Sequence, residues 1–193
     1  MKKKILLLGN GGHSISCADV IDSTKEFKIA GYVEKNNQIK TNKTNLKLLG
    51  YDKDLSKIFK HIKYAHICVG QIKDLELRKK LYKKLINIGF KLPVIISPSS
   101  LISKKNVTIE DGSIIMNNVV INSSTLIQSN CIINTGAIIE HECSIKSHTH
   151  IGPGSILNGG VNVGSQCFIG AGSVIRPYAK INDKKFIKMM SRV

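Results

Sequence analysis

The sequence has no tryptophan, few other aromatic residues and only three arginines. Lys and Arg number 29 against 13 Asp and Glu, so the formal charge is +16, and almost all of the positive charge is lysine. Such a charge is compatible with nucleic-acid binding, but the lysines are dispersed and few aromatic side chains exist for base stacking. We therefore expect no nucleic-acid partner, and a field that favours anionic ligands such as nucleotides.

Long apolar runs and paired cysteines are also missing. No segment approaches the length of a membrane-spanning helix, so we expect no membrane insertion. The five cysteines show neither a paired framework nor the CxxC spacing of metal sites. Free thiols are typical of a reducing compartment, which predicts a cytoplasmic protein.

A period of six residues organises the second half of the chain. Branched aliphatic residues stand six apart without a miss from Ile109 to Ile181, and a smaller side chain stands two positions before each. This period fits neither a helix nor an unbroken strand. It predicts a parallel β-helix of hexapeptide repeats, about three per coil, with the aliphatic side chains filling the axis. The last residues, 183–193, leave this pattern and predict a short helix that caps the open end.

The first half predicts a small Rossmann-like α/β domain. An apolar strand over 4–8 precedes Gly9-Asn10-Gly11-Gly12-His13, and helical spacing follows over 15–23. Strand, glycine-rich turn and helix in this order open a mononucleotide-binding unit, whose backbone N–H groups attract phosphate. Further strands are expected over 27–33, 64–69 and 93–96, with a helix over 74–88. The predicted domains are therefore residues 1–97 and 98–193.

The glycine motif alone is a weak signal, because it lacks the third glycine of a dinucleotide fingerprint. A nucleotide-binding oxidoreductase is accordingly a distant interpretation, and the short front domain opposes it.

Three of the six histidines and two carboxylates fall within residues 140–150. By register, His141 lies at a turn and points outward, while His150 lies on the outer wall of the next coil. Residues nine apart are about half a coil apart, so the two histidines line one site only in a groove between neighbouring prisms. An ordinary imidazole pKa of about 6.5 and an adjacent carboxylate make His141 a candidate general base. A metal site, or turn histidines without a role, are the open alternatives.

Taken together, the chain resembles the hexapeptide-repeat sugar acyltransferases of the sialic-acid O-acetyltransferase and UDP-4-amino-sugar N-acetyltransferase family. The resemblance rests on the Gly9–His13 loop, the segment Leu77–Tyr82, the hexapeptide run and Ile139-Glu140-His141-Glu142-Cys143. It implies a left-handed β-helix, a homotrimer with active sites between subunits, and acetyl-CoA as cosubstrate without a metal.

The resemblance also implies roles for individual residues. His141 is the implied catalytic base, and Glu142 orients it. Contacts to the nucleotide sugar are implied for Gly11, Gly12, His13, Glu34, Lys35 and Asn134. Contacts to the cofactor are implied for His150, Gly159, Gly170 and Ala171, with the Gly159 N–H facing the thioester carbonyl.

The expected function is an acetyl-CoA-dependent N-acetyltransferase that acts on the 4-amino group of a UDP-linked deoxyamino sugar in bacterial glycan biosynthesis. One alternative is O-acetylation of a sialic-acid-like sugar, or transfer of a different acyl group. Another is a catalytically impaired trimer that still binds the nucleotide sugar, because relatives usually carry a further coil and tail that help to hold CoA.

Overall fold

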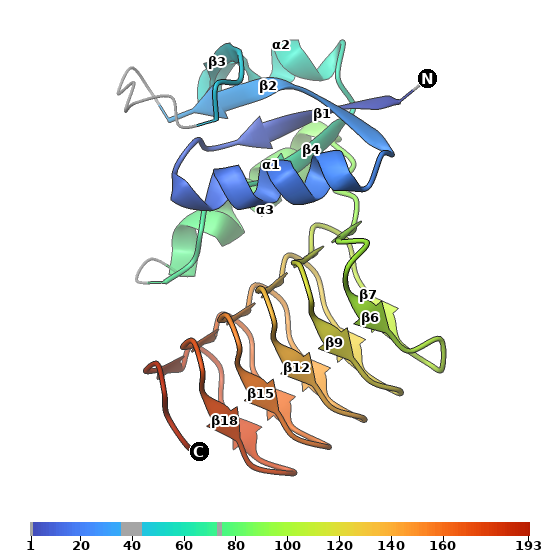
Figure 1. Cartoon of the computed structure of the whole chain (residues 1–193). Coiled ribbons are helices and arrows are strands. Elements are labelled where there is room, and N and C mark those ends of the chain that lie inside the picture. The colour runs from blue at the N-terminus through green and yellow to red at the C-terminus, as the bar shows by residue number, and fades with distance from the viewer. Residues whose placement is uncertain (1, 36–43, 73–74) are drawn as a thin grey trace. The chain divides into compact units, whose positions relative to one another are not determined.

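The computed structural model describes residues 2–35, 44–72 and 75–193. They form two compact units, one of residues up to Gly70 with Leu77–Pro93, and one of Gln71–Glu76 with Val94–Val193. Figure 1 shows both units, with helices in the first and stacked short strands in the second. Among the helices of the described residues, none has the length and apolar character needed to cross a membrane.

The first unit is a parallel sheet with helices. Its elements in chain order are β1 (Lys3–Leu8), α1 (Gly12–Ser23), β2 (Phe27–Glu34), β3 (Leu48–Tyr51), a 3-10 turn (Asp52–Asp54), α2 (Leu55–Phe59), β4 (Tyr64–Ile67) and α3 (Leu75–Ile88). The strand order is β3-β2-β1-β4, and every pair is parallel. Because β1 has β2 on one side and β4 on the other, the topology reverses there. Ligands bind beyond the carboxyl ends of the strands at such a point.

Two residues shape this edge of the sheet. Gly9 has φ +91°, and a Cβ atom on it would lie 2.9 Å from the Val69 side chain, so glycine is required by the fold. The buried Arg78 donates from Nη1 to the carbonyls of Ile67 and Val69, where β4 ends. A charged donor thus satisfies buried carbonyls that the sheet leaves without a strand partner.

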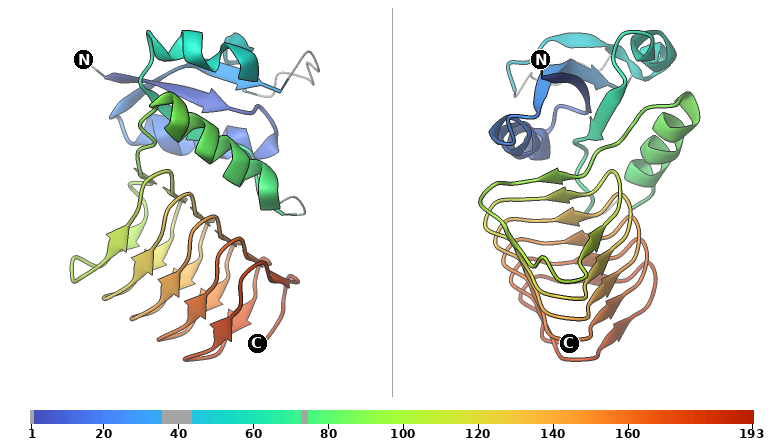
Figure 2. Two further views of the ribbon diagram at one scale, coloured as in Figure 1. Left: turned by 180° about the vertical axis from the view of Figure 1, so that it is seen from behind. Right: turned by 90° about the vertical axis from the view of Figure 1, so that its right-hand side faces the viewer.

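The second unit is a left-handed parallel β-helix with three faces, each a sheet of two-residue strands (Figure 2). Sheet one contains β6 (Leu101–Ile102), β9 (Val120–Ile121), β12 (Ile138–Ile139), β15 (Ile156–Leu157) and β18 (Val174–Ile175). Sheet two contains β7 (Thr108–Ile109), β10 (Leu126–Ile127), β13 (Ser144–Ile145), β16 (Asn162–Val163) and β19 (Lys180–Ile181). Sheet three contains β5 (Ile95–Ile96), β8 (Ile114–Ile115), β11 (Ile132–Ile133), β14 (His150–Ile151), β17 (Phe168–Ile169) and β20 (Phe186–Ile187).

The predicted inward positions are confirmed. The six-residue aliphatics form one buried cluster together with the smaller residues two before them, among them Cys131, Cys143 and Cys167. Burying one such aliphatic side chain stabilises the fold by roughly 1.5–3 kcal/mol, which explains why the period is unbroken. Small polar residues at the same inward position bond a corner carbonyl fifteen residues ahead, as Thr125 does to Glu140 at 3.1 Å.

The β-helix is longer than the sequence predicted at both ends. The strand expected over 93–96 is β5, which pairs with β8 in sheet three and does not belong to the front sheet. The tail expected as a helix instead contains β20, which pairs with β17, and Ile187 packs against the core. Ile187 stands six residues after Ile181, so the period continues and the helix prediction was wrong.

Candidate active site

His141 and Glu142 occupy the corner between β12 and β13. His141 Nδ1 lies 3.0 Å from a carboxylate oxygen of Glu142, and the two side chains are 51 % and 64 % exposed. Glu142 has φ +59°, the left-handed conformation that the second residue of such a corner adopts. A carboxylate only accepts, so it favours the proton on Nδ1 and leaves Nε2 as a proton acceptor.

Gly159 lies one coil after His141 in the same corner. A Cβ atom on Gly159 would be 2.7 Å from both Nε2 and Cε1 of the His141 ring, so only glycine leaves room for the imidazole. The next residue, Gly160, donates its N–H to the His141 carbonyl at 2.9 Å and fixes the stacking of the two turns. The basic nitrogen and the Gly159 backbone are therefore neighbours.

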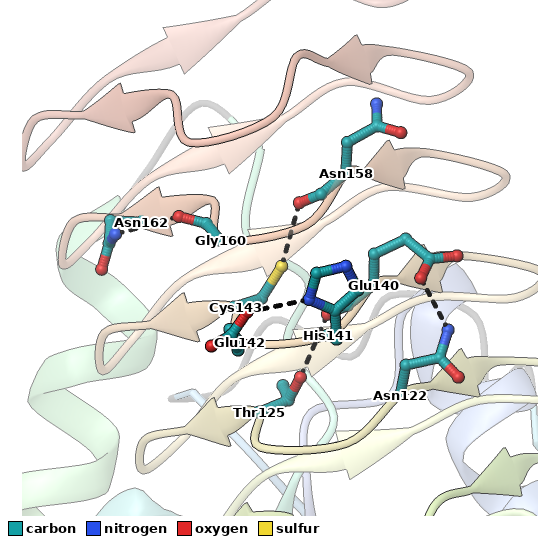
Figure 3. A network of polar contacts seen from close by, with 9 residues as sticks. All are labelled: Asn122, Thr125, Glu140, His141, Glu142, Cys143, Asn158, Gly160 and Asn162. Carbon is teal, nitrogen blue, oxygen red and sulfur yellow. Dashed lines mark hydrogen bonds and ion pairs between the residues drawn. The ribbon is translucent and has the colours of Figure 1, made fainter.

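The Gly159 N–H has no hydrogen-bond acceptor among the described residues. Glu140, the residue before the turn in the preceding coil, directs its carboxylate to the Asn122 amide at 3.0 Å (Figure 3). Sequence reasoning did not assign either residue. The signal was available in the coil length, because Asn122 precedes Glu140 by one coil of about eighteen residues.

A second group lies along sheet three. Asn134 Nδ2 is 3.1 Å from His150 Nε2, and His150 Nδ1 is 2.7 Å from the Gln71 carbonyl oxygen. His150 lies on the outer wall as the register predicted, but it is only 5 % exposed. Phe168 packs edge-on against its ring, with 5.2 Å between the ring centroids.

The hydrogen bonds at the two ends of this second group determine which of its atoms donate and which accept. The backbone N–H of Thr135 donates to Asn134 Oδ1 at 2.8 Å, so Nδ2 is the atom that faces His150. A carbonyl only accepts, so His150 Nδ1 carries the proton and Nε2 accepts from Asn134. Gln71 also donates its side-chain amide to the His148 carbonyl, and it is fully buried. No sequence pattern marked Gln71.

Gly170 and Ala171 follow β17, which lies next to the edge strand β20 in sheet three. A Cβ atom on Gly170 would lie 2.3 Å from the backbone nitrogen of Met189, so packing against the next coil already requires glycine there. Ala171 is half-buried, and its carbonyl accepts from the Met190 N–H at 2.9 Å. Within one chain, these residues share the sheet-three side with Asn134 and His150, and they are not brought to the corner of His141.

The glycine-rich loop lies in the first unit, beyond the carboxyl end of β1. Gly11 precedes α1 and Gly12 begins it, and a Cβ atom on either would meet no protein atom within 4 Å. Packing within the protein therefore does not demand glycine at these two positions, whereas close approach of a ligand to the backbone would. His13 follows in the first turn of α1, and its Cβ lies 3.6 Å from the position of a Cβ on Gly70.

Glu34 ends β2 and Lys35 follows it, next to the end of β1. Leu8 pairs with Val33, so the loop after β1 and the residues after β2 leave the same edge of the sheet. Glu34 is half-buried and Lys35 is exposed. The first unit therefore gathers five of the six predicted nucleotide-sugar residues at one edge, as the order of strands requires, while Asn134 belongs to the second unit.

The thiol nearest to the candidate base is held in its neutral form. Cys143 follows Glu142 and is 1 % exposed, and burial raises the pKa of its thiol to about 11. Its Sγ donates to the Asn158 carbonyl at 3.2 Å. Among the described residues, no three His, Cys, Asp or Glu side chains gather as a metal site.

Known proteins match both halves of the chain. The family model described as the PglD N-terminal domain matches residues 4–85, and that of the bacterial transferase hexapeptide matches residues 142–177. The perosamine N-acetyltransferase of Caulobacter crescentus superposes with a TM-score of 0.90 at 28% identity, over 98% of this chain and 88% of that one. Its structures contain CoA and GDP-perosamine, and two are of variants in which one histidine is replaced.

Over both halves, the chain is thus similar to hexapeptide-repeat sugar acyltransferases. The chain also shares its fold with the acetyltransferase domain of PglB from Neisseria gonorrhoeae, with a TM-score of 0.89 at 22% identity over 100% of this chain and 91% of that one. WeeI from Acinetobacter baumannii superposes with a TM-score of 0.73 at 18% identity, over 100% and 96% of the two chains. No curated protein matches the sequence.

Proposed function

We propose that this protein transfers the acetyl group of acetyl-CoA to the 4-amino group of a nucleotide-linked deoxyamino sugar. The observation that carries the proposal is the corner at His141: Nδ1 is bonded to Glu142, and Nε2 lies beside Gly159, whose N–H has no acceptor among the described residues. A general base and a backbone donor side by side suit attack on a carbonyl carbon.

The proposed step is direct transfer. The sugar amine nitrogen attacks the thioester carbon, and His141 Nε2 takes the proton that the amine loses. The Gly159 N–H donates to the carbonyl oxygen as negative charge develops on it. The C–S bond then breaks, and the proton passes from His141 to the departing CoA sulfur, so the products are the amide and free CoA. A thioester is already activated, so positioning and one base suffice.

The nucleotide part of the substrate is assigned to the first unit. Gly11 and Gly12 leave open space next to the start of α1, where backbone N–H groups attract phosphate. His13, Glu34 and Lys35 lie at the same edge of the sheet, at or just after the ends of β1 and β2. The sequence predicts UDP, whereas the neighbour from Caulobacter crescentus binds GDP-perosamine, so both nucleotides belong in the test.

A homotrimer is part of the proposal. The corner of His141 and the side of Asn134, His150, Gly170 and Ala171 belong to different faces of a three-sided prism. Two such groups form one site when the face of one subunit lies against the corner of the next. Acetyl-CoA would then lie between His141 of one subunit and the sheet-three side of its neighbour. Sedimentation at several concentrations tests this, since a monomer that is active would contradict it.

The acceptor is tested by measuring CoA release with a panel of substrates. The panel comprises UDP- and GDP-linked 4-amino sugars, the matching 4-hydroxy sugars, and a sialic-acid-like sugar, each with acetyl-CoA. We expect CoA release with a 4-amino sugar and an N-acetyl product by mass spectrometry. Release with only a hydroxyl acceptor would show an O-acetyltransferase. Binding of the nucleotide sugar without any release would show an impaired binding protein.

A further inference from the structure

At two turns of the corner after sheet two, a side chain from the preceding coil accepts the first N–H of the turn. Glu110 accepts the N–H of Ser129 at 3.0 Å, and Gln128 accepts the N–H of Ser147 at 3.2 Å. In both cases the acceptor is the last residue before a turn, and the donor is the first turn residue nineteen positions later. This arrangement caps an N–H that the strand ladder leaves open.

Glu140 and Gly159 have the same relationship at the corner after sheet one. Glu140 is the last residue before its turn, and Gly159 is the first turn residue nineteen positions later. The three turns have similar backbone conformations, because the second turn residue has positive φ in each: +58° at Asn130, +61° at His148 and +71° at Gly160. The corresponding cap is absent among the described residues, and the Glu140 carboxylate bonds the Asn122 amide instead.

We propose that Asn122 is a positioning residue that holds the Glu140 carboxylate away from Gly159 and so keeps that N–H open for the reacting carbonyl oxygen. The Asn122 Nδ2 to Glu140 Oε2 contact of 3.0 Å lies on the outer wall, one coil before His141, as Figure 3 shows. A carboxylate forms strong, charge-assisted bonds to backbone N–H groups, so a released Glu140 would take the Gly159 donor. This inference rests on the proposed function.

Backbone hydrogen exchange tests the arrangement without any substrate. In the intact protein the Gly159 N–H exchanges quickly, because nothing caps it. In Asn122→Ala we expect it to become protected, and in Asn122→Ala/Glu140→Ala to exchange quickly again. Glu110→Ala is the matched control: it should open the Ser129 N–H and leave Gly159 unchanged. Unchanged exchange of Gly159 in Asn122→Ala would overturn the proposal, whether or not the protein is an acetyltransferase.

Kinetics test the consequence for catalysis. We expect Asn122→Ala to lower kcat, by up to roughly 100- to 1,000-fold as for loss of one oxyanion donor, with little change in KM. Adding Glu140→Ala should restore kcat to the value of Glu140→Ala alone, because the competing carboxylate is gone. Independent, multiplied losses in the double variant would overturn the proposal. If exchange follows the prediction while no variant releases CoA, the failure lies in the proposed function.

Discussion

The imidazole of His141 lies directly beside the backbone of Gly159, so close that a Cβ atom on residue 159 would be 2.7 Å from Nε2. The two residues are one coil apart and belong to the same corner. The candidate base and the candidate oxyanion donor are therefore positioned by the stacking of neighbouring coils.

Gly159→Ala tests this relationship. We expect kcat to fall by roughly 100- to 10,000-fold, the usual contribution of a general base, because the added methyl group displaces the His141 ring. The ring is half-exposed and Gly159 lacks positive φ, so thermal unfolding should change little. Ser123→Ala, in the same corner one coil before His141, is the control and should keep its activity. Full activity in Gly159→Ala would show that the ring position is not critical.

Cys143 should take no covalent part in the reaction. Burial raises its pKa to about 11, so near neutral pH it is a thiol and a poor nucleophile. We expect Cys143→Ala to retain at least a large part of kcat, and iodoacetamide at neutral pH to leave Cys143 unlabelled in the intact protein. An acetyl group found on Cys143 by mass spectrometry after incubation with acetyl-CoA would contradict direct transfer.

Gln71 should fix the tautomer of His150. Its carbonyl accepts from Nδ1, and its side-chain amide holds residue 71 against the His148 carbonyl. Side-chain ¹⁵N NMR should show His150 neutral with the proton on Nδ1. In Gln71→Met, which removes the amide at similar length, the signals should indicate a mixture of tautomers. Ile72→Ala, at a 53 % exposed side chain of the same segment, should leave them unchanged. A proton on Nε2 in the wild-type protein would refute the assignment.

His66 should make the stability of the first unit depend on pH. Burial, and to a lesser extent the charge of Arg78, lowers the pKa of this fully buried imidazole. The unfolded chain then binds a proton at a higher pH than the folded one, so stability is complete above about pH 6.5 and declines as the pH falls below it. Thermal unfolding across this range should show a fall in Tm that is smaller in His66→Leu. An equal decrease of Tm with falling pH in the wild type and in His66→Leu would contradict this prediction.

The sequence predicted most of the β-helix because the residue types within each six-residue repeat indicate which side chains point inward and which point outward. The inward aliphatics, the buried cysteines and the outward turn at His141 follow from counting in sixes, and the coil of about eighteen residues aligns His141 with Gly159. Ile187 also stands six residues after the preceding inward aliphatic. The lysines around it resemble the polar face of an amphipathic helix, so a helix was predicted wrongly. The apolar pair Ile95–Ile96 is a strand, as predicted, but its residue types do not show which unit it belongs to. It was therefore assigned to the front sheet, whereas it pairs with β8 of the β-helix.

Other features leave no local pattern. The Gln71 carbonyl meets His150 from far away in the sequence, and a backbone oxygen has no residue type that could mark it. Whether Glu140 bonds Asn122 or Gly159 depends on competition between two acceptable hydrogen bonds, which the residue types alone do not decide. The open space at Gly11 and Gly12 likewise required coordinates, because glycine in a turn serves packing as often as it serves a ligand.

The most direct test of the central claim is the rate of CoA release by His141→Asn, compared with the wild type under saturating acetyl-CoA and a nucleotide-linked 4-amino sugar. We predict a loss of roughly 100- to 10,000-fold in kcat, with the oligomer and the binding of both substrates retained. A variant that releases CoA at the wild-type rate would contradict the assignment of His141 as the base.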